Sequence, residues 1–337
     1  MFKQLQFFLN KFAYIYILLI FTFIFGLISL VNHYQFRTDA LDLGMLNHAL
    51  YNFAHFEQNL FTIDIAGEEV NYFGDHFSPI MFLYIPFYYL FGSYTLLLIQ
   101  IVAIAFGGYG IYKYSQLHFK NNTIPILFLI HFFGFWGIYS ALSYDFHNNV
   151  VATMFVPWLL YYYEKSNKKM FLLFFALILI SKENMALWLA FILLGLVCKK
   201  TTKSTFKKLL RFEIPLIIFA LLFFVLTISV VMPYLRDGHG FSQLARYSHL
   251  GNTIPEILNT IIQKPSYVFS LLFENTTASL DHYGIKSQLH FMVLISGGFA
   301  LFYKPRFLLM LVPIYAQKLL TNNTGFWGVH LQYSIEF

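Results

Sequence analysis

Long apolar runs separated by short polar segments dominate the pattern along this chain. The first run, residues 12–31, is long enough as a helix to cross roughly 30 Å of hydrocarbon. It follows Lys3 and Lys11 and lacks a small-residue cleavage site, so it is predicted to be a retained span and not a removable signal peptide. Further apolar runs cover residues 94–114, 124–142, 150–163, 170–180, 185–198, 212–234, 288–303 and 307–320. The pattern predicts an all-α polytopic membrane protein.

Composition supports this fold class. Of 337 residues, 58% are hydrophobic and 11% are charged, whereas roughly a quarter are charged in an ordinary soluble domain. The 42 Phe and 24 Tyr residues suit helix packing in lipid and the aromatic belts at its surfaces. With the single cysteine Cys198, a disulfide framework within the chain is excluded. The predicted partner is the lipid bilayer, and no nucleic acid partner is predicted.

The positions of the basic residues predict an orientation. Of the 22 Lys and Arg residues, 15 lie in clusters at the ends of the apolar runs: Lys3, Lys11, Lys113, Lys120, Lys165, Lys168, Lys169, Lys199, Lys200, Lys203, Lys207, Lys208, Arg211, Lys304 and Arg306. If all of these are cytoplasmic, 14 of the 16 acidic residues lie on the opposite side. We therefore expect a multi-pass protein of the cell membrane with a cytoplasmic N-terminus.

This topology divides the chain, which we expect to form one transmembrane module over residues 1–337. Counting residues 78–91 as a full span would invert every later cluster, so this short segment is predicted to be interfacial. Two outer loops follow, residues 32–77 with a juxtamembrane helix and residues 235–287 with helical stretches such as 255–263. Residues 170–180 and 185–198 are predicted to enter from the cytoplasm, turn at Ser181–Asn184 and return.

The first outer loop carries two acids at the start of an amphipathic pattern. Apolar residues at Leu46, Leu50 and Phe53 are spaced for a helix lying on the membrane, and Asp39 and Asp42 precede them. Either these acids cap the helix and complement its dipole, which Thr38 and Asp39 would do well, or they form part of a site. Spacing alone leaves both interpretations open.

Two further polar groups flank apolar segments. Asp75 and His76 end the first outer loop, directly before Ser78-Pro79, which is typical of a helix start. Asp145 and His147 lie in a short loop between two spans, where they either bind a metal or a phosphate or form a solvated turn.

The remaining polar candidates lie inside the apolar runs. Lys182 and Glu183 lie at the turn of the predicted hairpin. Either they form a functional pair of opposite charges that partly neutralise each other, or they belong to a turn at the membrane interface. Gly107-Gly108-Tyr109-Gly110 lies in a predicted span and indicates close helix packing. The nucleotide-binding and common hydrolase motifs are missing from the sequence.

Taken in order, these segments resemble the GT-C superfamily of membrane glycosyltransferases. More closely, the chain is similar to a prokaryotic family of predicted multi-pass membrane proteins of unknown function, allied to GT-C enzymes. The matching words are Asp42-Leu43-Gly44, His76-Phe77-Ser78-Pro79, Asp145-Phe146-His147, Lys182-Glu183, Gly251 with the following helix, and HLQYS from His330 to Ser334. Asn184 occupies the position after Lys182-Glu183 at which the family resemblance leads us to expect another acidic residue. The chain ends just after HLQYS, where relatives continue with more spans, so a longer module is expected.

The resemblance implies a GT-C-like helical bundle that transfers a sugar from a polyprenyl-phosphate carrier, the lipid-linked donor, to an acceptor at the outer face. It implies Asp42 as the general base, with Asp39 in reserve. Lys182 and His330 are the expected phosphate contacts, and the expected substrate or metal contacts are Asp75, His76, Asp145, His147 and Glu183. Whether a divalent metal assists at the phosphate is left open by the sequence, and no other cofactor is predicted.

Two other classes of function remain open. A transporter or flippase for a lipid-linked or small polar substrate would use the Lys182–Glu183 pair, and it predicts internal pseudo-symmetry, although the sequence shows no repeat. A non-catalytic scaffold would keep the fold without the chemistry. The sugar, the carrier, the acceptor and the oligomeric state are not determined by the sequence.

Overall fold

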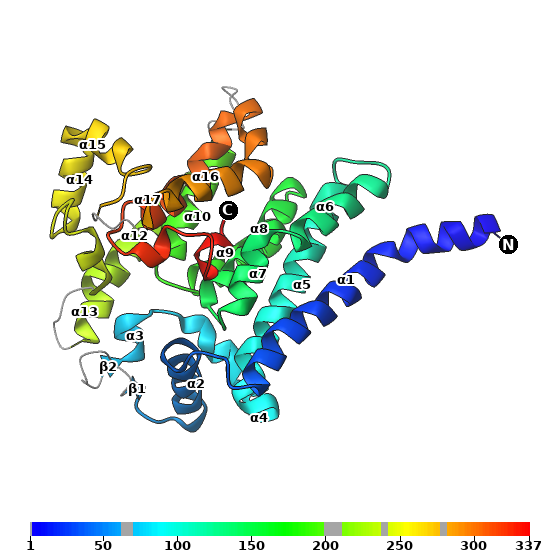
Figure 1. Cartoon of the computed structure of the whole chain (residues 1–337), viewed down its shortest axis with the longest axis horizontal. Coiled ribbons are helices and arrows are strands. Elements are labelled where there is room, and N and C mark those ends of the chain that lie inside the picture. The colour runs from blue at the N-terminus through cyan, green and yellow to red at the C-terminus, as the bar shows by residue number, and fades with distance from the viewer. Residues whose placement is uncertain (1, 62–69, 199–210, 237–241, 277–281) are drawn as a thin grey trace. The chain divides into compact units, whose positions relative to one another are not determined.

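The structure is a computed structural model that describes residues 2–61, 70–198, 211–236, 242–276 and 282–337 (Figure 1). Its contacts divide the chain into two compact units. Unit 1 comprises residues 1–72, 78–182 and Glu336, and unit 2 comprises residues 73–77, 183–335 and Phe337. The predicted basic stretch from Lys199 to Lys208 lies outside the described residues. Each unit is described by itself.

Unit 1 is built from helices that follow the predicted apolar runs. They are α1 (Phe2–Tyr34), α2 (Met45–His55), α4 (Ile85–Phe91), α5 (Thr95–Gln116), α6 (Thr123–Phe133), α7 (Trp136–Ser143), α8 (Asn148–Glu164) and α9 (Lys168–Leu179). A two-residue antiparallel pairing, β1 (Leu60–Phe61) with β2 (Val70–Asn71), precedes the short helix α3 (Tyr72–Asp75). The prediction of an all-helical architecture is confirmed.

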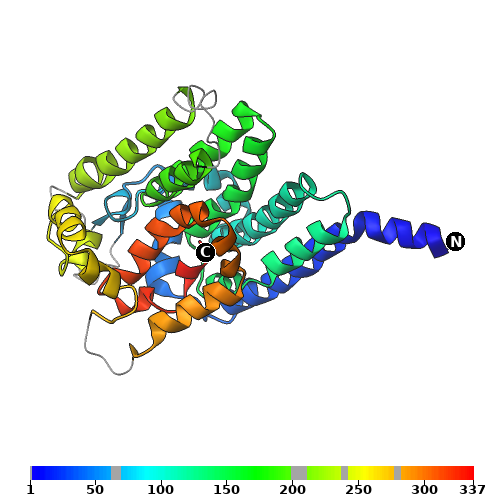
Figure 2. The same cartoon turned by 90° about the horizontal axis from the view of Figure 1, so that it is seen from above.

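Helix α5 packs against α1, α6 and α8 (Figures 1 and 2). A Cβ atom at Gly107 would lie 2.6 Å from the sulfur of Met154, and one at Gly108 would collide with the ring of Phe133. At Gly110 a Cβ atom would lie 2.9 Å from the indole nitrogen of Trp158. Small residues allow the helix backbones this approach in lipid. The packing interpretation of these glycines is confirmed.

Unit 2 contains α10 (Met185–Val197), α12 (Glu213–Leu226), α13 (Met232–Tyr234), α14 (Ile254–Gln263), α15 (Pro265–Ser270), α16 (Ile285–Ile295) and α17 (Leu308–Leu319). Helix α10 packs against α12 and α17. The indole nitrogen of Trp188 donates to the carbonyl oxygen of Met310 at 3.0 Å, and Gly195 leaves room for the Met310 side chain. The apolar helix α10 is therefore held to α17 by a polar contact as well as by packing.

Four helical stretches of the described chain are long and apolar enough to cross a membrane: Phe12–Tyr34, Pro79–Gln116, Thr123–Ser143 and Glu213–Tyr234. The predicted interfacial segment 78–91 forms the first part of the second stretch, because its short helical turns run on into α5. Two shorter apolar helices, α10 and α16, accompany them. The chain thus has the helices of a multi-pass membrane protein, and its orientation stays a prediction.

Candidate functional site

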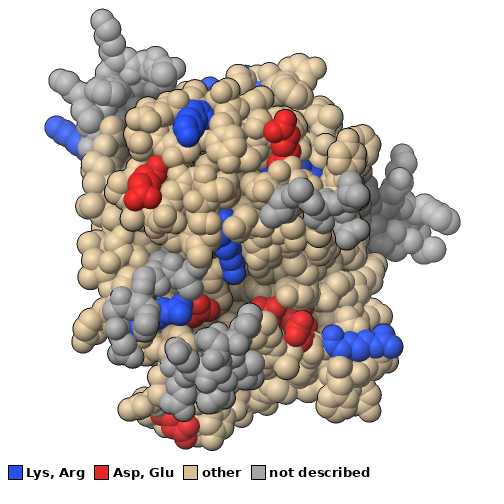
Figure 3. Space-filling view, turned by 60° about the vertical axis from the view of Figure 1, so that its left-hand side comes forward, with Lys and Arg blue, Asp and Glu red and all other residues tan. Residues whose placement is uncertain are grey.

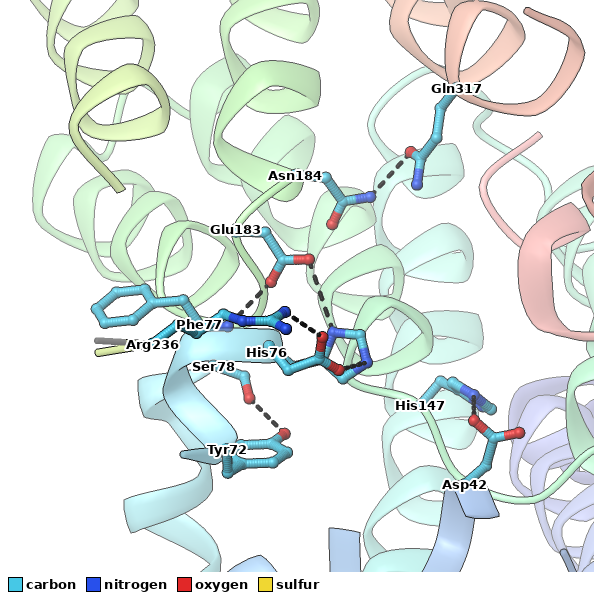
Figure 4. A network of polar contacts seen from close by, with 11 residues as sticks. Asp42, Tyr72, His76, Phe77, Ser78, His147, Glu183, Asn184, Arg236 and Gln317 are labelled. Atoms are coloured by element: carbon cyan, nitrogen blue, oxygen red, sulfur yellow. Dashed lines mark hydrogen bonds and ion pairs between the residues drawn. The ribbon is translucent and has the colours of Figure 1, made fainter. Parts of the chain in front are cut away.

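The carboxylate of Asp42 is the centre of a polar cluster in unit 1. Asp42 lies on a turn of π-helix, Ala40–Gly44, directly before α2. Its Oδ2 accepts a hydrogen bond from the Tyr144 hydroxyl at 2.6 Å. Its Oδ1 lies 3.7 Å from Nε2 of His147 (Figure 4). The Asp42 side chain is 27% exposed and that of His147 is 8% exposed. One carboxylate is therefore held by two partners and still reachable from outside.

The local sequence explains why Asp42 is presented in this way. The neighbouring Leu43 is buried and holds the turn, as do Leu46 and Leu50 in α2. One turn of π-helix directs the side chain differently from the α-helix that follows, and such turns are frequent at functional sites. The Tyr144 ring stacks on His147 with the ring centroids 5.6 Å apart, which orients both partners of the carboxylate.

Asp145 lies in the same cluster and is buried. It adopts a left-handed backbone conformation with φ of 62°, and its Oδ2 accepts a hydrogen bond from the Asp39 amide at 2.6 Å. The Gln100 side chain in α5 donates to the Asp145 carbonyl at 2.6 Å and accepts from the His147 amide at 2.9 Å. Left-handed non-glycine residues are strained and cluster at functional sites. Interpreting this loop as a solvated turn is therefore wrong.

Burial raises the pKa of the Asp145 carboxyl to about 6, with a smaller contribution from the nearby Asp39 and Asp42 carboxylates, while the Asp39 amide opposes the shift. Because the folded-state pKa lies above the ordinary value of 3.8, protonation favours the folded state. This stabilisation is fully present below pH 3.8 and is lost as the pH rises through about 6.

We expect Asp145→Asn to remove this part of the pH dependence. Asn accepts the Asp39 amide bond and tolerates a left-handed backbone, but it does not ionise. Relative to wild type, the variant should gain at most about 3 kcal/mol between pH 4 and pH 7. Thermal unfolding of the purified protein in detergent, followed across this pH range, measures the difference. A wild-type-to-variant difference that stays constant with pH would contradict the expectation.

The capping interpretation of the first-loop acids is not supported by their contacts. Asp39 precedes the π-helical turn, but its side chain makes no capping hydrogen bond, and its carbonyl accepts from the amides of Leu43 and Gly44 instead. The Thr38 hydroxyl lies 2.9 Å from Nδ1 of His33. The turn is therefore closed by backbone bonds, and Asp42 is available for the contacts with Tyr144 and His147.

A second polar cluster lies within unit 2. His76 Nε2 lies 3.5 Å from Asp75 Oδ2, and its Nδ1 lies 3.9 Å from Glu183 Oε1. The Phe77 amide donates to Glu183 Oε2 at 3.1 Å, and Arg236 Nη1 lies 3.5 Å from Asp75 Oδ1 (Figure 4). The Glu183 side chain is 5% exposed. One imidazole is thus placed between two carboxylates, of which Arg236 partly neutralises one and a backbone amide binds the other.

The remaining predicted site residues join neither cluster through a described contact. Lys182 is half-buried, and in the described part of the chain it has no ion pair, so Glu183 is paired with His76 instead. His330 is exposed and lies against Gly328. Asn184, which stands where a third acid was expected, donates to the side chain of Gln317 at 2.9 Å.

Three residues of these clusters were missed by sequence reasoning. Tyr144 directly precedes the motif Asp145-Phe146-His147, and this position next to two candidate residues could have identified it as a site residue. Gln100 is a polar residue in an apolar run, where polar side chains are costly and need a partner. Arg236 lies two residues after the run 212–234, and nothing in the local sequence distinguishes it from a flanking cation.

Among the described residues, no three or more His, Cys, Asp or Glu side chains are arranged to hold a metal ion. In unit 1 the Asp42 carboxylate, which accepts a hydrogen bond from Tyr144 and lies 3.7 Å from His147, is close to a second carboxyl, Asp145, whose pKa burial raises to about 6. A strongly shifted pKa in a cluster of charged side chains is typical of functional sites.

Comparison with known proteins identifies one family. Residues 32–336 match the family described as "Predicted membrane protein (DUF2079)". No curated protein and no solved structure matches the chain. The match begins at the predicted first outer loop and includes both polar clusters, as well as the motifs from Asp42 to Ser334. This chain therefore belongs to the DUF2079 family of predicted membrane proteins.

Proposed function

We propose that this protein is a membrane glycosyltransferase that transfers a sugar from a polyprenyl-phosphate carrier to an acceptor at the outer face of the membrane, as the resemblance to GT-C enzymes implies. The observation that carries the proposal is the geometry of Asp42: a partly exposed carboxylate on a π-helical turn, bonded to Tyr144 and beside His147. A general base needs this combination of fixed orientation and access.

The proposed reaction needs one base and one leaving group. Asp42 takes the proton of the acceptor hydroxyl, whose oxygen attacks the anomeric carbon of the donor sugar. The bond between that carbon and the phosphate oxygen breaks, and the polyprenyl phosphate leaves with the electron pair. A cationic side chain stabilises the leaving phosphate, a role that the resemblance assigns to Lys182, which belongs to the same unit as Asp42.

The test uses the full chain in proteoliposomes with a panel of polyprenyl-phosphate-linked radiolabelled hexoses. The expected result is transfer of label from the lipid phase to a glycan acceptor fraction, with release of free polyprenyl phosphate. Label that crosses the bilayer with its donor bond intact would instead establish a transporter. Donor that is neither cleaved nor moved, for every hexose of the panel, would count against both and favour a scaffold.

Tyr144→Phe is expected to lower transfer roughly tenfold, because a hydrogen bond to a charged group is worth about 1.5 kcal/mol or more. Loss of the hydroxyl also removes a donor that favours the ionised form of Asp42, so the acid limb of the pH–rate profile should shift to higher pH. Rates measured between pH 5 and pH 8 test both effects. An unchanged profile would show that Tyr144 does not act through Asp42.

A further inference from the structure

An apolar surface covers the outward side of α14 and α15 in unit 2. Leu258 and Ile262 in α14 are 53% and 77% exposed, and Phe269 and Phe273 in and after α15 are 63% and 52% exposed. Each pair is spaced four residues apart, which places its members on one side of the helix. Figures 1 and 2 show both helices, in yellow, at the periphery of unit 2.

The inward side of the same helices already has its packing partners. Ile257, Val268 and Leu272 pack on a core of Leu250, Leu271 and Leu320. The Thr260 hydroxyl donates to the Leu250 carbonyl at 2.6 Å and fixes which side of α14 faces inward. The outward apolar residues are therefore not needed to complete this core, and something else must cover them.

Charge along this segment argues for lipid as the cover. Lys264 is the only charged residue from Ile257 to Phe273, whereas about a quarter of the residues are charged in an ordinary soluble domain. Figure 3, in which the left-hand side of Figure 1 is turned forward, shows Lys, Arg, Asp and Glu side chains scattered among uncharged residues on that face. Lys264 and the half-exposed Tyr267 are residue types that anchor at the headgroup level.

Other apolar helices of unit 2 also expose large hydrophobic side chains. The Phe273 ring lies 4.9 Å from that of His290 in α16, an apolar helix that itself exposes Phe291 and Ile295. Helix α12 belongs to a candidate span and exposes Ile218, Phe219 and Leu222 in the same unit. A protein partner would need to match several helices, whereas the hydrocarbon boundary covers such a surface without specific contacts.

We propose that α14 and α15 are interfacial helices whose outward side is embedded at the headgroup–acyl boundary of the bilayer, although they belong to the predicted outer loop 235–287. Lys264 and Tyr267, between and within the two helices, mark the headgroup level. Glu256 and Gln263 are exposed on the opposite side of α14 from Leu258. The inference does not depend on the proposed function.

The test is the accessibility of nitroxide spin labels on the full chain in lipid nanodiscs. Cys198 is exposed, so it is first replaced in a Cys198→Ser background. Labels at Ile262→Cys and Phe269→Cys are compared with controls on the opposite side of α14, Glu256→Cys and Gln263→Cys, which are also exposed. Collision with oxygen, which concentrates in lipid, is measured against collision with a water-soluble nickel chelate.

We expect the oxygen-to-nickel collision ratio to be several-fold higher at Ile262 and Phe269 than at their controls. Equal ratios would place this surface in water and overturn the proposal. Low collision with both reagents at Ile262 and Phe269 would mean that protein covers it, from a second copy or another chain, and would also overturn the proposal. Sugar transfer is not part of the readout, so failure of the proposed function leaves the result unaffected.

Discussion

Asp42→Asn should lower sugar transfer by about 10²–10⁴-fold, the contribution typical of a positioned general base. Asn has nearly the same shape, and its side-chain oxygen still accepts the Tyr144 hydroxyl, so the turn Ala40–Gly44 is expected to keep its conformation. What is lost is the negative charge that accepts the acceptor's proton. Initial rates in proteoliposomes with saturating donor measure the loss, and binding of polyprenyl phosphate alone should change little.

The matched control is Glu57→Gln, which removes an exposed acid just after α2, in the same predicted loop. It should transfer sugar at the wild-type rate. If Asp42→Asn also kept the wild-type rate in an active preparation, Asp42 would not be the base. If both variants lost activity equally, the effect would come from the charge of the loop and not from a reacting group.

Lys286→Met should lower the stability of the folded protein strongly. The Lys286 side chain is 1% exposed, and its ammonium donates to the carbonyls of Leu271, Glu274 and Leu319 at 2.6, 2.9 and 2.8 Å. It also lies 4.4 Å from the centre of the Trp327 ring. Met fills a similar volume but donates nothing, so about 3–5 kcal/mol should be lost as buried carbonyls are left without a donor.

Lys286 has this effect because it connects three elements of unit 2. From the start of α16 it reaches Leu271, at the end of α15, and Leu319, at the end of α17, where carbonyls lack partners within their own helices. Unfolding midpoints in mixed micelles measure the change, with the exposed Lys304→Met as control. Similar midpoints for the two variants would show that the three carbonyls do not depend on Lys286.

Local patterns were sufficient for much of the fold. The amphipathic spacing of Leu46, Leu50 and Phe53 predicted α2, and the apolar runs predicted α5, α8, α9, α10 and α17 within a few residues. Residues 78–91, predicted to be interfacial, instead belong to the continuous helical stretch Pro79–Gln116. The predicted run 288–303 was less accurate, because α16 ends at Ile295 and shorter helical turns follow. The apolar periodicity of a helix is a pattern of nearby residues, so the sequence alone predicts that the helix exists. The residue at which a helix ends depends also on packing, so the ends are predicted less accurately.

The site was only partly predictable, because its decisive contacts join distant residues. Asp42, Asp145 and His147 were candidates from their residue types. Two contacts of this site depend on how α5, α7 and α2 pack. Tyr144 donates a hydrogen bond to Asp42, and Gln100 in α5 donates one to the Asp145 carbonyl. The pairing of Glu183 with His76 likewise could not be preferred over the sequence neighbour Lys182.

Apolar composition and periodicity are properties of contiguous segments, so they predicted the lipid environment of this protein and the position of most helices. Which polar residues are buried, and which partners they meet, depends instead on how the helices pack. Asp145 and Lys286 look like loop and surface residues in the sequence, yet both are buried against backbone groups that come from elsewhere in the chain. Burial of a polar group depends on partners supplied by packing, and those partners are not encoded in the neighbouring residues.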